Sequence, residues 1–276
     1  MTRFFVVPQW QGSPAARAMH LIDGAEAIAG DLPRAATVRI DVPVEAGESL
    51  DTGIRRFSAL TRVRDALTDA LQAGVAAHGT DDHSVVIGGD CGVAVPAIAH
   101  AATHHETLAV VWFDAHGDLN TPGGSPSGAF SGMALRAVFD DLPLAGSGAV
   151  PAERVVLAGV RELDTPEQQL IDEAELTTVD VDVLADPAAL VEAVAATGAT
   201  AVYLHVDLDV LDPAAITGVA LPVPFGLSLD ELIAAVKAVR AQFPLAGASI
   251  AGFAPASPVA AVDDLGTILR IVGALA

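Results

Sequence analysis

The chain has 276 residues, of which 52% are hydrophobic, which is enough for a large core and argues against disorder. The formal net charge of -21 argues against binding to nucleic acid or to anionic membrane surfaces, whereas an acidic site favours a metal ion or a cationic substrate. Cys91 is the single cysteine and no apolar stretch reaches the length of a signal peptide or a membrane span, so we expect a cytoplasmic protein without disulfides.

The first half of the chain alternates between short apolar runs and longer amphipathic segments. We expect strands over residues 4–7, 36–42, 84–87 and 108–113. Helices are expected over residues 15–29, 58–78, 93–104 and 133–139. An acidic, glycine-containing loop is expected over 45–56, and a loop rich in Gly, Pro and Ser over 117–128.

The second half continues this alternation. We expect strands over residues 154–157, 176–179, 199–206 and 246–253, and helices over 165–173, 187–196, 228–242 and 263–275. Eight mostly apolar strands separated by helices predict an α/β fold of three layers, with a central, mainly parallel eight-stranded sheet covered on both faces. No internal repeat or linker divides the chain, which predicts a single domain over residues 1–276.

Metal-ligand residues follow three of the expected strands. They are Asp90 and Cys91, then Asp114, His116 and Asp118, and finally Asp207 and Asp209. Ligands of open parallel sheets bind outside the carboxyl ends of the strands, and alternate residues of an extended strand share one face. A lone Asp-x-Asp is common in turns and caps, but an Asp-x-His-x-Asp after a buried strand is not explained by turn chemistry. The pattern therefore predicts a binuclear metal site.

Three segments also carry a family resemblance. Gly-Gly-Asp at 88–90, Asp-Ala-His-Gly-Asp-Leu-Asn-Thr-Pro at 114–122 and Asp-Leu-Asp-Val-Leu-Asp-Pro at 207–213 closely resemble the signatures of the arginase (ureohydrolase) family. The resemblance implies an arginase-like α/β fold, two manganese ions and hydrolysis of a guanidino or amidino C–N bond. The default reaction is arginine and water giving ornithine and urea, in a homo-oligomer of three or six subunits.

The resemblance also implies roles for single residues. Asp114 and Asp207 would bridge both metals, Asp118 would complete the first metal position, and His116 with Asp209 would complete the second. Carboxylates and imidazole suit manganese, and two cations that share a water lower its pKa enough to supply a bridging hydroxide. Asp118 would be the catalytic residue that helps to deliver a proton to the departing amine.

At the substrate end, Asn120, Ser125 and Ser127 match positions that hold the α-carboxylate of the amino acid in arginases. Asp164 and Glu167 match the acidic residues that hold its α-ammonium. The alternative for the latter pair is a helix N-terminus, where acidic residues are favourable in any case. The two serines could equally be ordinary polar residues of a loop.

Three positions depart from the family. Cys91 replaces a histidine ligand, and a thiolate there would shift metal preference toward zinc or iron. Alternatively, only one of the two metal positions is filled, or Cys91 is a small buried thiol without a role as a ligand. Ser131 replaces a histidine that shuttles protons, and Gly252 replaces a glutamate that binds the guanidinium. His205 shares the face of Asp207 and is a conceivable substitute ligand, but we expect a core histidine.

These departures leave the substrate open. The partner is expected to be a small cationic guanidino or amidino compound. The alternatives to arginase are an agmatinase, a guanidino-acid hydrolase, a formiminoglutamase-like enzyme, or a catalytically impaired metal-binding homologue. Of these, the formiminoglutamase-like reading is least affected by Ser131, because such enzymes need not share the arginase histidine.

Overall fold

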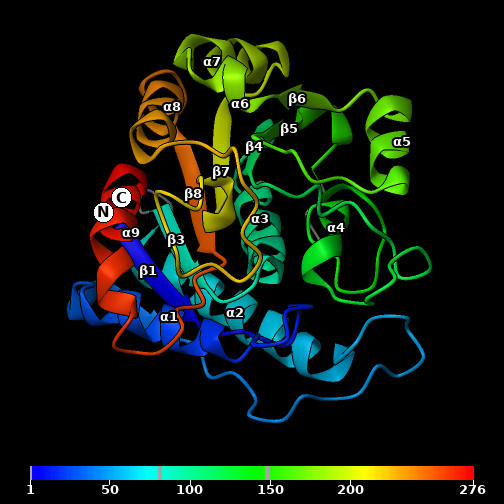
Figure 1. Cartoon of the computed structure of the whole chain (residues 1–276), viewed down its shortest axis with the longest axis vertical. Coiled ribbons are helices and arrows are strands. Elements are labelled where there is room, and N and C mark those ends of the chain that lie inside the picture. Colours follow the sequence, from blue (N-terminus) through cyan, green and yellow to red (C-terminus); the bar gives the residue numbers. More distant parts are fainter. Residues whose placement is uncertain (1, 80–82, 147–149) are drawn as a thin grey trace.

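The fold is built on one eight-stranded sheet, shown in the computed structural model, which describes residues 2–79, 83–146 and 150–276 (Figure 1). The strand order is β2-β1-β3-β8-β7-β4-β5-β6, and every neighbouring pair is parallel. The strands are β1 (Thr2–Val7), β2 (Thr37–Arg39), β3 (His83–Gly88), β4 (Leu108–Phe113), β5 (Val155–Ala158), β6 (Thr177–Val179), β7 (Ala201–Asp207) and β8 (Leu245–Ala251). The predicted eight-stranded parallel sheet is confirmed.

Helices connect the strands and lie on both faces of the sheet. They are α1 (His20–Gly30), α2 (Phe57–His78), α3 (Ala94–Ala102), α4 (Arg136–Phe139), α5 (Thr165–Glu173), α6 (Val181–Leu184), α7 (Pro187–Ala196), α8 (Leu229–Gln242) and α9 (Ala261–Leu275). Since a parallel connection crosses back over the sheet, both faces become covered and the strands read as continuous apolar runs.

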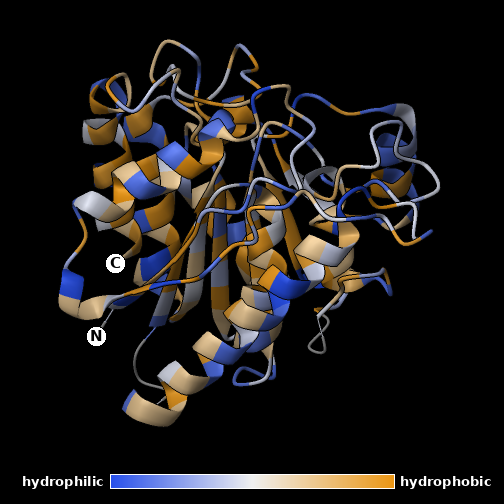
Figure 2. Cartoon of the chain, turned by 90° about the horizontal axis from the view of Figure 1, so that it is seen from below, coloured by the Kyte–Doolittle hydropathy of each residue, from blue (hydrophilic) through white to orange (hydrophobic). Residues whose placement is uncertain are grey.

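Two hydrophobic cores fill the space between the sheet and its helices. Helices α1, α7, α8 and α9 pack on one face, and α2, α3 and α4 pack on the other. Strand β1 shows the alternation, because Phe4 and Val6 enter the first core while Phe5 and Val7 enter the second. In Figure 2, blue hydrophilic segments are most frequent on the outer helices and loops around this apolar centre.

Most elements lie where the pattern predicts them, and the differences have local causes. The helix expected from residue 15 begins at His20, because residues 16–19 form turns in which N–H groups bond three residues back. The strand expected over 36–42 is reduced to Thr37–Arg39, which lies at the edge of the sheet and pairs with β1 alone. The short helix α6 was not predicted. Among the described helices, none combines the length and the apolar character required to cross a membrane.

The strand order determines where the ligand-type residues meet. Strands β3, β8, β7 and β4 are consecutive neighbours in the centre of the sheet. Cys91 follows β3, Gly252 follows β8, Asp207 ends β7 and Asp114 follows β4. Residues that are up to 161 positions apart in sequence therefore converge at one edge.

Candidate metal centre

An acidic cavity of about 170 Å³ opens at the carboxyl edge of these central strands. Its lining includes six carboxylate residues and one imidazole, that of His116, with no lysine or arginine among the lining residues of the described chain. The six are Asp90, Asp114, Asp118, Glu167, Asp207 and Asp209. This lining is complementary to cations, as the sequence predicts.

Asp114 is held by the strand that precedes it. Its Oδ2 accepts a hydrogen bond from Trp112 Nε1 at 3.1 Å, and its Oδ1 accepts one from the His116 backbone N–H at 2.7 Å. His116 Nδ1 lies 3.4 Å from Asp114 Oδ1 and 3.1 Å from Asp209 Oδ2. The tryptophan was not identified from the sequence as a site residue, although it lies two positions before Asp114 on a fully buried strand.

Asp207 and Asp209 are placed by the end of β7. Asp207 is the last residue of the strand and caps the following 3-10 turn (Leu208–Val210) by accepting from the Asp209 N–H at 2.9 Å. Asp209 Oδ1 accepts from the Ala115 N–H at 3.1 Å, which ties the two strand ends together. Cys91 Sγ lies 2.8 Å from Asp207 Oδ2 and donates to it as a thiol.

Asp118 reaches the cavity by a turn rather than by strand alternation. Strand β4 ends at Phe113, and Asp118 has a left-handed φ of 51°, which is uncommon outside glycine. Its Oδ2 is buried and lacks a hydrogen-bond partner within the described chain. A buried, unpartnered carboxylate oxygen that faces a cavity is costly unless a cation or a ligand satisfies it.

Two sets of ligand atoms form within this cluster, each with its atoms within 4.8 Å of one another. One set is Asp114, His116 and Asp209, and the other is Cys91, Asp114 and His205. Asp114 belongs to both, which is the arrangement expected of a bridging carboxylate. Asp207 joins through its contact with Cys91, whereas Asp118 lines the cavity outside both sets. The donor types fit the implied metals, because divalent cations are held by carboxylate, imidazole and thiolate groups.

The carboxylates crowd one another. Burial, together with repulsion from Asp209, raises the pKa of Asp207 to about 7. Burial and repulsion from Asp114 raise the pKa of Asp209 to about 6, and the same two causes raise the pKa of Asp118 well above its usual range. Burial lowers the pKa of His116, but hydrogen bonds from its ring to Asp114 and Asp209 outweigh this and raise it to about 12. Without a metal, the cluster therefore binds protons more readily than isolated carboxylates do, and cations would compete with these protons.

The Gly-Gly-Asp segment shapes the wall of the site instead of offering a free ligand. Asp90 Oδ1 accepts from Gln9 Nε2 at 2.8 Å and from the Gly92 N–H at 3.0 Å, and its Oδ2 accepts from the Gly12 N–H at 2.9 Å. A Cβ on Gly89 would lie 1.8 Å from the Gln9 carbonyl oxygen, so only glycine fits there. Asp90 thus anchors the N-terminal loop beside Cys91.

The predicted substrate residues are only partly brought together. Asn120 and Ser127 line the cavity, and the buried Oδ1 of Asn120 has no partner in the described chain. Asp164 and Glu167 form the capping box of α5, with Asp164 Oδ2 also accepting from Asn120 Nδ2 at 2.9 Å. Glu167 lines the cavity, whereas Asp164 and Ser125 are outside its lining. Ser125 instead bonds the Gly128 N–H at 3.1 Å.

Backbone conformation and the neighbouring Asp207 leave no space for a side chain at position 252. The φ of Gly252 is +88°, and a Cβ at this position would lie 2.2 Å from Asp207 Oδ1. A glutamate therefore cannot replace Gly252 without displacement of Asp207 or of the backbone. The family glutamate is not merely missing from the sequence; this conformation has no space for it. Ser131 also lines the cavity, at the start of the 3-10 turn Ser131–Met133.

His205 lies beside the candidate ligands, as one member of the set with Cys91 and Asp114. It is fully buried on β7, and its ring lies 3.7 Å from the ring of Trp112 between centroids. Its Nδ1 lies 2.7 Å from Ser249 Oγ, while its Nε2 has no partner in the described chain. Burial lowers the pKa of His205 to about 3, so the ring is neutral. The ring lies in the core, as expected, and it also belongs to one of the two candidate ligand sets.

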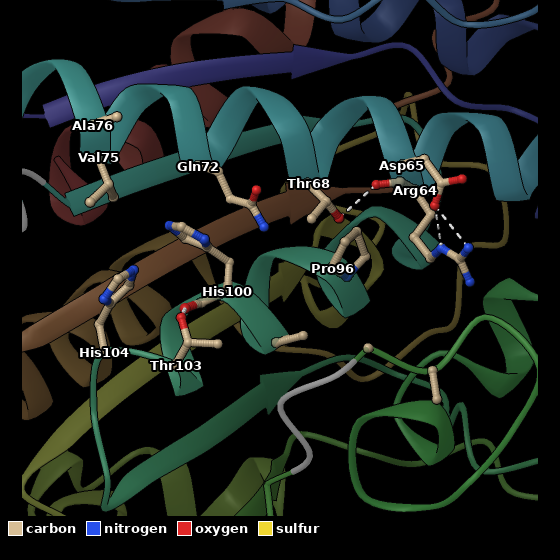
Figure 3. Close-up of a pocket in the computed structure, with 13 residues that line it drawn as sticks. Arg64, Asp65, Thr68, Gln72, Val75, Ala76, Pro96, His100, Thr103 and His104 are labelled. Atoms are coloured by element: carbon tan, nitrogen blue, oxygen red, sulfur yellow. Dashed lines mark hydrogen bonds and ion pairs between the residues drawn. The ribbon is translucent and has the colours of Figure 1, made fainter.

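A second, larger cavity of about 630 Å³ lies away from this cluster (Figure 3). It is lined mainly by α2 and α3, and His100 and His104 approach each other there with ring centroids 5.0 Å apart. Thr68 on the opposite wall is satisfied by the Arg64 carbonyl at 2.8 Å. None of its lining residues belongs to the acidic cavity, so size does not identify the functional site here.

Comparison with known proteins agrees with this geometry. The model of the arginase family matches residues 23–263. The chain is 35% identical to the arginase of Bacillus caldovelox over 206 residues, which cover 69% of this chain and 68% of that protein. It is 32% identical to an arginase of Staphylococcus aureus over 200 residues, covering 69% of this chain and 65% of its relative.

Solved arginase structures share the fold of this protein over nearly the whole chain. Arginase from Entamoeba histolytica in complex with L-ornithine superposes with a TM-score of 0.85 at 22% identity, covering 99% of this chain and 97% of that one. The native arginase of Bacillus caldovelox superposes with a TM-score of 0.80 at 28% identity and the same coverage. The fold, the acidic cavity and the sequence match agree: the chain belongs to the arginase family of hydrolases.

Proposed function

We propose that this protein is a metal-dependent hydrolase that cleaves a C–N bond of a small cationic guanidino or amidino compound, with arginine as the first substrate to test. The observation that carries the proposal is the pair of ligand sets that share Asp114 within an acidic cavity. Relatives named arginase support the choice of arginine. Two divalent ions, manganese by family resemblance, would supply an activated water and polarise the substrate.

The chain's own residues account for the remaining requirements. Asp114 belongs to both candidate ligand sets, with His116 and Asp209 on one side. Asp207 contacts Cys91 of the other set, and we expect it to be the second carboxylate shared between two cations. Asp118 has a free, buried carboxylate oxygen suited to carry a proton toward a departing amine. The carboxylate lining would attract a guanidinium group and disfavour anions.

The substrate ends would be recognised by fewer groups than in the family pattern. Asn120 Oδ1 is unpartnered within the described chain, and Ser127 lines the cavity with an Oγ that accepts from the Ala129 N–H at 3.2 Å. Glu167 contributes negative charge, although both of its oxygens already accept backbone hydrogen bonds. With glycine at position 252, the guanidinium lacks a bidentate carboxylate partner there. We therefore expect a high KM for arginine.

The test is a substrate panel with manganese-loaded protein. We expect urea release from at least one of arginine, agmatine, guanidinobutyrate and guanidinoacetate, or formamide release from formiminoglutamate. Asp209→Asn serves as the metal-deficient control. No product from any of these compounds, with both metals bound, would reject hydrolysis.

Gly252 motivates a second candidate. Because Asp207 occupies the space that a side chain at position 252 would need, the chain is also compatible with a catalytically impaired homologue that binds metal as a regulatory subunit. Such a protein would bind two metals and release no product from the panel. The homo-oligomeric state stays a prediction, and sedimentation of the metal-loaded chain tests it.

A further inference from the structure

The buried His205 lies close to Cys91, the residue that replaces the histidine ligand of the family pattern. Cys91, Asp114 and His205 present ligand atoms that all lie within 4.8 Å of one another. Metal–ligand bonds measure about 2.0–2.3 Å, so two ligand atoms on one ion are about 3.5–4.5 Å apart. The three side chains therefore need little movement to hold a single ion.

Three neighbouring strands orient the imidazole. The strand register pairs Trp112 on β4 with His205 on β7, and His205 with Ser249 on β8. Trp112 and His205 each lie two residues before a candidate ligand carboxylate, that of Asp114 or Asp207. The Trp112 ring packs against the His205 ring, with planes inclined by 30°. With its proton on Nδ1, His205 donates to Ser249 Oγ at 2.7 Å, which leaves the lone pair of Nε2 free. Metal-bound histidines are commonly fixed in this way by a hydrogen bond at the other ring nitrogen.

The free nitrogen argues against a purely structural role. His205 has 0% exposure, and its Nε2 has no partner among the described residues. A buried, unpaired polar atom costs about 1–3 kcal/mol, and an apolar residue on this strand would avoid that cost. Cys91 is likewise buried, at 4% exposure, and its sulfur lies 2.8 Å from the carboxylate oxygen Oδ2 of Asp207.

We infer that His205 and Cys91, with Asp114, form a nitrogen, sulfur and oxygen ligand set for the first metal position, and that His205 supplies the imidazole that position 91 lacks. The two positions would then differ in character. The first contains a thiolate and favours a borderline-soft cation such as zinc or cobalt, whereas Asp114, His116 and Asp209 form a harder site that suits manganese. The inference rests on the proposed metal centre but not on the substrate.

Cobalt(II) titration of the metal-free 276-residue chain tests this ligand set, because a thiolate bound to cobalt gives a charge-transfer band in the near ultraviolet. We expect the wild type to bind two cobalt ions per chain and to show the band. Cys91→Ala and His205→Phe should each bind one ion tightly, without the band. Phenylalanine keeps the contact with Trp112 and removes the unpaired nitrogen, so a merely structural histidine would tolerate it.

Two control variants sharpen the result. His116→Phe should lose the other ion and keep the thiolate band, and His100→Phe, in the distant cavity, should keep both ions and the band. If circular dichroism shows that His205→Phe does not fold, Ser249→Ala decides. Loss of the hydrogen bond to Nδ1 should weaken cobalt binding at the thiolate position by about 10-fold.

The inference is overturned if the wild type shows no thiolate band, or if His205→Phe folds and binds two ions with an unchanged band. Unchanged cobalt affinity in Ser249→Ala would equally overturn it. The outcome is separable from that of the substrate panel. A chain with the expected cobalt signature but no hydrolytic product supports this ligand set and rejects the proposed reaction, and an active chain whose His205→Phe variant keeps two ions does the opposite.

Discussion

Arg161 is predicted to stabilise the segment that carries Asp209, although its hydrogen bonds within the described chain go to backbone carbonyls and not to candidate ligand side chains. Its guanidinium donates to four carbonyl oxygens at 3.0 Å or less. These belong to Gly159 at 3.0 Å, Asp209 at 2.8 Å, Val223 at 2.8 Å and Pro224 at 3.0 Å. The side chain thus joins the loop after β5, the turn after β7 and the loop near residue 224.

The expected effect of Arg161→Ala follows from these bonds. A net contribution of about 1 kcal/mol per hydrogen bond would give about 4 kcal/mol, but Arg161 is half-buried and the freed carbonyls can be hydrated, so we expect a loss of about 2–3 kcal/mol. For a chain of this size, whose unfolding entropy is about 0.6 kcal/mol/K, that corresponds to a decrease in Tm of about 3–5 °C. Metal affinity at the Asp209 position should also fall by about 10-fold, as is typical when a group that orients a ligand is lost.

The assay is thermal unfolding with and without metal, alongside isothermal metal titration. Arg270→Ala is the matched control, because Arg270 pairs with Asp230 at 2.6 Å on the exposed surface and should cost less than about 1 kcal/mol. Arg161→Lys keeps the charge but not the planar set of donors, so it should recover part of the loss. If Arg161→Ala unfolds within about 1 °C of Arg270→Ala, or if lysine restores wild-type behaviour, the reasoning is refuted.

Three further outcomes are expected. Gly252→Ala should lower stability and metal binding, because the added Cβ would clash with Asp207 Oδ1. The control Gly266→Ala, on an open face of α9, should raise stability by about 1 kcal/mol, and equal effects of the two variants in unfolding experiments would contradict this. The metal-free protein should lose stability as pH rises from about 4 to 7, because the raised pKa values of Asp207 and Asp209 make the folded state bind more protons than the unfolded state in this range. A free energy of unfolding, measured by denaturant titration, that stays constant or increases with pH would reject the explanation. Asp118→Asn should reduce kcat by at least about 100-fold at saturating metal and arginine, and unchanged turnover would remove Asp118 from proton delivery.

Much of the candidate site could be predicted because its ligands follow strands in short motifs. Asp114, His116, Asp207 and Asp209 lie after continuous apolar runs, and the edge of a parallel sheet is the expected place for such residues to meet. The assignment of Asp118 to the same face by alternation was incomplete, because β4 ends at Phe113 and Asp118 itself has a left-handed φ of 51°. Its place beside the cluster depends on that backbone conformation.

The residues around the motifs were harder to judge. Sequence spacing alone could not choose between a helix cap and a substrate contact for Asp164 and Glu167, and the structure shows the capping box. It shows no contact that assigns either residue to substrate, so that role stays a prediction. Arg161 was passed over because its partners are backbone carbonyls from three distant segments, which leave no trace in a local pattern.

The sequence by itself determined the sheet, its covering helices and the family, because hydrophobic periodicity and strand-end motifs are local properties of the chain. Only the tertiary structure decided what the departures from the family mean. Gly252 lies against Asp207 because β8 and β7 are neighbours, and His205 lies between Trp112 and Ser249 because three strands are in register. Such contacts join residues up to 93 positions apart, and they arise from strand order and register, which fold class alone does not fix.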